Sequence, residues 1–274
     1  MGTLRAVLVL IALVPPTLVA IVLQWLFVKL NLRAAALLPV WWHRYVLALI
    51  GIRVIAKGAP TTARPMLILA NHASWLDIEI LGSLMPLSFI AKAEVAGWPI
   101  FGLFAKLQRT VFVDRTRRSK TGEVASAIAE RLNDGDAMVL FAEGTSNDGN
   151  GVLPFRSALI GAARNAVLHG GHERVWIQPL SIAYTTLGGI PMGRYERPLV
   201  AWYGDMEMFP HLWAILKKGA IDVEIRWGHP IPYDEDSDRK AIALGAERVV
   251  RAMTLDALRG SGTFETDKVH AELS

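Results

Sequence analysis

The stretch that most constrains this chain runs from residue 6 to residue 28 and contains no charged side chain. A helix of that length covers the hydrocarbon thickness of a bilayer. Basic residues flank it, with Arg5 before the stretch and Lys29, Arg33 and Arg44 after it. Because basic residues collect on the cytoplasmic side of membrane segments, the sequence predicts attachment to a membrane, with the rest of the chain in the cytoplasm.

The form of this anchor stays open. No small-residue cleavage site follows the apolar run, which argues against a signal peptide. Pro15 and Pro16 interrupt the run, so two short helices within one leaflet are an alternative to a single span. A second apolar stretch, residues 34–42, ends in two tryptophans, which is typical of a membrane interface. We predict a helical membrane anchor over residues 1–50, either spanning or re-entrant.

After the anchor, strand-like runs alternate with helical patterns. Apolar or β-branched runs of strand length occupy residues 52–56, 66–70, 87–91, 110–113, 137–141, 176–183 and 221–227. Helical patterns occupy residues 75–85, 99–107, 120–133, 157–168, 210–218 and 236–258. This alternation predicts an α/β fold with a mixed central β-sheet flanked by helices, spanning residues 51–259. Residues 260–274 are polar and are expected to fray.

Composition excludes several classes of protein. A hydrophobic content of 52% and a mean hydropathy of +0.32 are high for a freely soluble protein. A net charge of +4 suits an anionic membrane or substrate, but it is too weak to indicate nucleic acid. The absence of cysteine excludes disulfides, thiolate metal sites and a cysteine nucleophile. The chain also lacks the zinc-protease, serine-hydrolase, P-loop and dinucleotide motifs, so we expect no metal and no bound cofactor.

The strand at residues 66–70 leads into a turn and a helix that carry a histidine and an aspartate. Ser74 is expected to cap the helix, and Asp77 lies in its first turn. His72 stands on the turn, five residues before that carboxylate. Imidazole titrates near neutrality, and a neighbouring carboxylate fixes its tautomer and strengthens it as a base. We interpret the two residues as a catalytic pair; the alternative is a histidine satisfied at a strand end beside a helix-capping aspartate.

Candidate binding residues follow later strands. Arg115 ends the strand at residues 110–113, and guanidinium suits bidentate binding of phosphate or carboxylate. After the strand at residues 137–141, a turn is expected to direct Glu143 and the backbone N–H groups of Gly144 and Thr145 into a common crevice. Arg156, before a helix that Ser157 is expected to cap, is a second candidate anion ligand.

Four blocks in order give a resemblance to a known family. The His-x4-Asp motif at residues 71–77 is followed by residues 111–115, residues 141–145 and a strand containing Pro179. Over residues 50–230 the chain resembles the glycerolipid acyltransferase family, in particular its bacterial 1-acylglycerol-3-phosphate acyltransferases. The resemblance implies transfer of a fatty acyl group from acyl-CoA or acyl-carrier protein, a co-substrate rather than a cofactor, to a lysolipid hydroxyl at the membrane. The expected acceptor is 1-acyl-sn-glycerol-3-phosphate.

The resemblance also assigns roles to residues. His72 would be the general base and Asp77 its orienting partner, while Arg115 would bind the acceptor's anionic head group. Glu143, Gly144 and Thr145 would complete the acceptor site. Lys92 and Glu94 occupy a family-like Lys-x-Glu position and are lesser candidates.

Departures from the family pattern keep alternatives open. Ala142 and Ser146 stand where the third block usually has proline and arginine, and Arg109 stands where glycine is frequent. The missing arginine weakens the case for a phosphate-bearing acceptor, although Arg109, Arg115 or Arg156 could take its place. A lyso-ornithine lipid acyltransferase, with the same chemistry on an acceptor without phosphate, is the alternative. Two further hypotheses are a non-catalytic lipid-binding protein and a hydrolase in which His72 activates water.

Overall fold

The computed structural model describes residues 2–113, 121–157, 160–161 and 172–260. Within these residues, nine strands form one sheet in the order β1-β8-β6-β2-β5-β3-β4, with β7 and β9 also paired to β6. The strands are β1 (Ile52–Lys57), β2 (Met66–Ala70), β3 (Ser88–Lys92), β4 (Val111–Val113), β5 (Ala137–Phe141), β6 (Val175–Leu187), β7 (Ile190–Pro191), β8 (Ile221–Trp227) and β9 (Ile231–Tyr233).

The sheet is mixed, as expected. Strand β6 runs antiparallel to β7, β8 and β9, while the other pairs are parallel. The helices are α1 (Gly2–Lys29), α2 (Ala34–Ile50), α3 (Leu76–Leu84), α4 (Phe101–Leu107), α5 (Thr121–Asn133), α7 (Met208–Lys218) and α8 (Arg239–Arg259), with 3₁₀ turns η1 (Ala93–Gly97) and η3 (Arg197–Leu199). The α/β prediction is confirmed. The helix expected at residues 157–168 and the tail from residue 261 fall largely or wholly outside the described residues.

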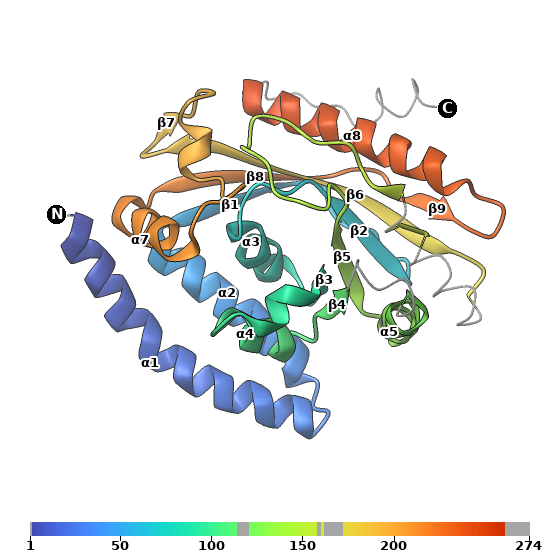
Figure 1. The fold of residues 1–274 in the computed structure, drawn as a ribbon, viewed down its shortest axis with the longest axis horizontal. Helices are drawn as coiled ribbons and strands as arrows, with labels where there is room; N and C mark the ends of the chain where they lie inside the picture. Colours follow the sequence, from blue (N-terminus) through green and yellow to red (C-terminus); the bar gives the residue numbers. More distant parts are fainter. Residues whose placement is uncertain (1, 114–120, 158–159, 162–171, 261–274) are drawn as a thin grey trace.

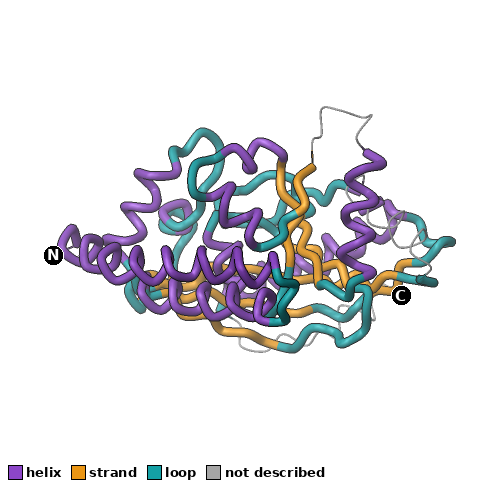
Figure 2. The backbone as a smooth tube through the Cα atoms, turned by 90° about the horizontal axis from the view of Figure 1, so that it is seen from below, coloured by secondary structure: helices purple, strands orange, loops and turns teal. Residues whose placement is uncertain are grey.

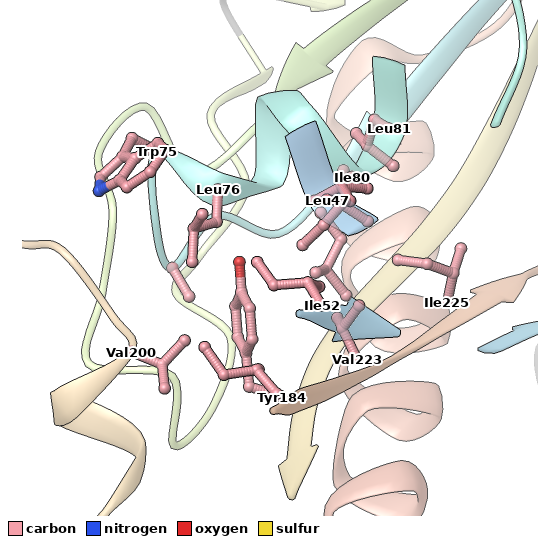
Figure 3. Close-up of a cluster of buried hydrophobic side chains, with 14 of the residues drawn as sticks. Leu47, Ile52, Trp75, Leu76, Ile80, Leu81, Tyr184, Val200, Val223 and Ile225 are labelled. Carbon is pink, nitrogen blue, oxygen red and sulfur yellow. The ribbon is translucent and has the colours of Figure 1, made fainter. Parts of the chain in front are cut away.

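Both faces of the sheet are covered (Figure 1). Side chains of β2 alternate between two cores: Met66, Ile68 and Ala70 pack with α1, α2, α3 and α7, while Leu67 and Leu69 pack with α5 and α8. All of β2 is buried, which explains why it reads as a continuous apolar run rather than an alternating one. Figure 3 shows part of the first core, where Tyr184 on β6 directs its hydroxyl toward Leu76 at the start of α3.

Helix α1 continues without a break through Pro15 and Pro16, so of the two alternatives left open the structure has the single helix. Pro16 has no N–H for the carbonyl of Ala12, four residues earlier. The Tyr45 hydroxyl of α2 donates to that carbonyl instead, at 2.7 Å. Because the Tyr45 hydroxyl supplies the missing donor, the carbonyl is satisfied although the helix continues through Pro16.

Among the described residues, α1 is the one helix long and apolar enough to cross a membrane. It nevertheless lies along the molecule, beside α2, α4 and α7 (Figures 1 and 2). Arg5 donates to the backbone carbonyls of Leu216 and Ile50, which ties the start of α1 to α7 and α2. Side chains of α1 and α2 belong to the same core as the sheet, and the domain division at residue 50 stays a prediction.

Candidate active site

His72 and Asp77 are in contact where β2 ends and α3 begins. The Nδ1 of His72 lies 2.8 Å from Oδ2 of Asp77. The Asp77 side chain is completely buried, whereas 18% of the His72 side chain is exposed. With Nδ1 held by the carboxylate, Nε2 is the ring nitrogen left for proton exchange with a substrate.

The Asp77 carboxylate accepts three further hydrogen bonds. The backbone N–H groups of Ala73 and Ser74 donate to Oδ2 at 2.8 Å and 3.0 Å. The hydroxyl of Tyr184 donates to Oδ1 at 2.5 Å. Four donors therefore fix the carboxylate that faces His72, and a buried charge is tolerated only when it is hydrogen-bonded in this way.

Tyr184 is a functional residue that the sequence did not identify. Burial raises the pKa of Tyr184 well above its ordinary value, and the charge of Asp77 raises it further. The phenol therefore stays protonated and remains a donor. The one available signal was a tyrosine beside a largely apolar run, since a buried tyrosine hydroxyl usually has a partner. Nothing in the sequence identifies Asp77 as that partner.

Ser74 does not cap α3, contrary to expectation. Its hydroxyl donates to the carbonyl of Val200 at 2.9 Å. The residue that precedes the helix, Trp75, has helical backbone angles and makes no side-chain capping bond. The side chain of Asp77 instead receives the nearby N–H groups, so the aspartate both starts the helix and orients the histidine.

Glu143 is buried behind the His72 turn, with 1% of its surface exposed. Its Oε1 accepts from the His72 backbone N–H at 3.3 Å, and its Oε2 accepts from Nδ2 of Asn147 at 2.7 Å. The backbone N–H of Asn147 donates to the carbonyl of His72 at 2.9 Å. Burial raises the pKa of Glu143 to about 8, against the lowering effect of its hydrogen bonds. Glu143 and Asn147 thus hold the backbone of the turn that carries His72.

The turn after β5 differs in detail from expectation. Gly144 has φ +75°, a conformation that favours glycine. Its N–H donates to the carbonyl of Phe141 at 3.0 Å, so this N–H group closes the turn and is not directed into the crevice. Phe141 stacks on the His72 ring with centroids 4.0 Å apart and planes at 17°. Gly144 and Thr145 both line the cavity next to His72.

That cavity has a volume of about 540 Å³ and is largely apolar. It extends from His72 past β3, η1 and α4 to α1 and α2. Its wall includes Ile21, Leu38, Phe89, Trp98, Phe101 and Phe104. Cavities of this size and lining bind small apolar ligands, and a fatty chain is one of them.

The structure brings only some of the expected binding residues together. Lys92 and Glu94 line the cavity with His72. Arg156 is exposed and is not part of the cavity wall; its Nε donates to the carbonyl of Glu143 at 3.1 Å. Arg156 therefore stabilises the backbone next to the His72 turn, and its position gives no evidence for the expected anion-binding role. Arg115 lies outside the described residues.

Comparison with known proteins gives a consistent set of relatives. Residues 51–183 match the family model described as "Acyltransferase". The chain is 51% identical over 259 residues to lyso-ornithine lipid O-acyltransferase of Brucella abortus, covering 94% of this chain and 97% of the relative. It is 43% identical to the Rhizobium meliloti enzyme of the same name, and the match covers 90% of this chain and 85% of that enzyme. The 1-acyl-sn-glycerol-3-phosphate acyltransferase of Neisseria meningitidis is 30% identical, and the match covers 78% of this chain and 79% of that enzyme.

A solved structure shares the fold. The crystal structure of the 1-acyl-sn-glycerophosphate acyltransferase PlsC from Thermotoga maritima aligns with a TM-score of 0.64 and 19% identity. The alignment covers 97% of this chain and 100% of PlsC. The fold, a mixed sheet between helices, is therefore shared with a known acyltransferase.

Proposed function

Because this chain belongs to the acyltransferase family, we propose that it transfers a fatty acyl group from an acyl thioester to the free hydroxyl of lyso-ornithine lipid. Acyl transfer to a lysolipid follows from the family; the identity of the acceptor is the proposal. Its main support is that the lyso-ornithine lipid enzymes match at higher identity than the Neisseria enzyme. The expected acceptor, 1-acyl-sn-glycerol-3-phosphate, becomes the second candidate, with the same chemistry.

The charges beside His72 also favour an acceptor without phosphate. Among the described residues that line the cavity, Lys92 is the single lysine or arginine, and Glu94 carries the opposite charge nearby in sequence. An ornithine head group has one ammonium and one carboxylate, which suit a glutamate and a lysine. A phosphomonoester with up to two negative charges would call for more cations. Ser146, at the position where the third block of the family pattern usually has arginine, agrees with this assignment.

The chemistry follows from the position of His72. We propose that its Nε2 removes the proton of the acceptor hydroxyl while the oxygen attacks the thioester carbonyl, forming a C–O bond. The tetrahedral intermediate then collapses and the C–S bond breaks. The leaving thiolate takes the proton back from Nε2, so the products are an ester and a free thiol. The Asp77 carboxylate stabilises the imidazolium between these two proton transfers.

The cavity and α1 suggest how the substrates are held. The apolar wall suits a fatty chain whose reacting end lies at His72. Many apolar side chains of α1 are exposed, among them Leu4, Leu8, Ile11, Leu18, Val19 and Val22. We propose that this surface lies in the cytoplasmic leaflet of the inner membrane, where acyl-CoA or acyl-carrier protein is available to donate the chain.

A direct assay tests this function. The purified enzyme receives labelled acyl donor with lyso-ornithine lipid or lysophosphatidic acid in parallel reactions. We expect preferential acylation of lyso-ornithine lipid and a loss of roughly 100- to 10,000-fold in His72→Ala, the range for a general base. Preferential acylation of lysophosphatidic acid would overturn the acceptor assignment. Release of free fatty acid independent of any acceptor would indicate a hydrolase, and lipid binding without product a carrier.

A further inference from the structure

Four polar side chains interrupt the apolar wall of the cavity away from the His72–Asp77 pair. They are Gln24 of α1, His43 of α2, Glu79 of α3 and Gln108 at the end of α4, here called the cavity cluster. Polar groups are expensive to bury against hydrocarbon unless they have partners. The proposed acyl transfer uses none of these four.

The cavity cluster is contiguous. The Nδ1 of His43 lies 2.6 Å from Oε2 of Glu79, and its Nε2 lies 3.2 Å from Oε1 of Gln108. Gln24 joins next to Gln108, because its Nε2 donates to the carbonyl of Leu107 at 3.0 Å. The same Nε2 donates a second hydrogen bond, to the carbonyl of Ala35 at 2.8 Å.

Two acceptor oxygens in this cluster are left over. Gln24 is 5% exposed, and its Oε1 has no partner among the described residues. Its amide cannot reverse without facing that oxygen toward two carbonyls, so the orientation is fixed by the bonds of Nε2. The Oε1 of Glu79 likewise has no hydrogen-bond partner among the described residues. Glu79 is part of the cavity wall, and 14% of its side chain is exposed.

These oxygens specify the chemistry of a ligand. A plain hydrocarbon chain satisfies neither of them, and the charge of Glu79 disfavours an anion. An alcohol donates to such an oxygen while its carbon chain packs on the apolar wall. We propose that the cavity cluster binds a hydroxyl group carried on a fatty chain, so that the enzyme prefers a chain hydroxylated at one position over a plain chain. This inference rests on the proposed function, and the chain belongs either to the acyl donor or to the lysolipid.

The test compares hydroxylated and plain chains in the full-length enzyme. One arm offers acyl-CoA donors of one length with a hydroxyl at successive carbons, and lyso-ornithine lipid as acceptor. The other arm keeps a plain donor and varies an additional hydroxyl on the chain of the lysolipid. We expect kcat/KM to rise about tenfold for one positional isomer in one arm, the effect of a hydrogen bond to a charged or buried acceptor. Equal kcat/KM for every isomer in both arms would overturn the proposal.

Variants assign the effect to the cavity cluster. Gln24→Met and Glu79→Met keep side-chain volume and remove the two acceptor oxygens, and at least one of the two variants is expected to reduce the tenfold preference to less than about threefold. Tyr45→Phe is the matched control: it also removes a hydrogen bond between α1 and α2, at Ala12, but Tyr45 is not part of the cavity wall. It should keep the full preference.

The readout separates this proposal from its premise. Since the preference is a ratio of two kcat/KM values for one preparation, a partly misfolded variant changes both values and leaves the ratio. An unchanged preference in both Gln24→Met and Glu79→Met would place the selectivity elsewhere and overturn the proposal. If a variant does not fold, the wild-type isomer series alone still decides. Failure of the proposed function gives a different result, namely no ester product from any pair of substrates.

Discussion

Asp77→Asn isolates the charge of the aspartate from its geometry. The carbonyl oxygen of asparagine can replace Oδ2 and accept from His72, Ala73 and Ser74, as the carboxylate does. Its amide nitrogen then takes the place of Oδ1, where the Tyr184 hydroxyl can rotate to accept instead of donate. The hydrogen-bond count is preserved, and the negative charge beside the imidazole is lost.

The expected loss follows from the distance between the two groups. The His72 and Asp77 contact atoms are 2.8 Å apart, which puts the centres of charge about 4 Å apart once the proton is on the ring. With an effective dielectric constant of about 20, the attraction is about 4 kcal/mol. This stabilisation exists only after His72 has taken the proton, so its loss raises the barrier. We expect kcat to fall roughly 1,000-fold, at about 1.4 kcal/mol for each factor of ten.

The assay is steady-state acyl transfer to lyso-ornithine lipid, with the free energy of unfolding measured on the same preparations. Tyr184→Phe is the matched control, because it removes one donor and keeps the charge. It should lower the free energy of unfolding by about 1.5–3 kcal/mol, the contribution of a hydrogen bond to a charged group, but reduce kcat by only about tenfold. A loss of less than tenfold in Asp77→Asn, or an equal loss in the two variants, would refute the assignment of the charge to catalysis.

Three further predictions concern other parts of the molecule. The pKa of Glu143 is about 8 in the fold against an ordinary 4.5, so the folded state holds an extra proton between these values and the free energy of unfolding falls as pH rises from about 4.5 to about 8. Glu143→Gln should flatten this dependence of the unfolding free energy on pH, measured by denaturant titration at several pH values. The same pH dependence in wild type and variant would contradict the prediction. Tyr45→Phe should lower stability by about 0.5–1.5 kcal/mol, and by less in a Pro16→Ala background, where the backbone supplies its own N–H; a double-mutant cycle without coupling would contradict this. Lys92→Met and Glu94→Gln should each raise KM for lyso-ornithine lipid several-fold with little change in kcat, and an unchanged KM would remove these residues from the acceptor site.

Local sequence determined the central geometry of this protein. An apolar run ending at Asn71, a histidine on the turn and an aspartate five residues later are enough to place His72 against Asp77, because strand, turn and helix geometry relates residues so close in the chain. The alternating strands and helices likewise sufficed for a mixed sheet covered on both faces. The same local reasoning failed for the Ser74 cap, because the Ser74 hydroxyl donates to the distant carbonyl of Val200. It left the helix at Pro16 undecided, because the Tyr45 hydroxyl that donates to the free carbonyl lies on another helix.

Tertiary structure decided what completes the site. Tyr184 reaches Asp77 across 107 residues of sequence, and Gln24 reaches Leu107 across 83. Neither pairing has a sequence signal, since a tyrosine in a strand or a glutamine in an apolar helix has many partners it could find. The core that β6 shares with α3, and the packing of α1 against α4, select one of them. Backbone geometry over a few residues thus arranged the base, and the docking of distant elements decided how firmly it is held and what the adjoining cavity can accept.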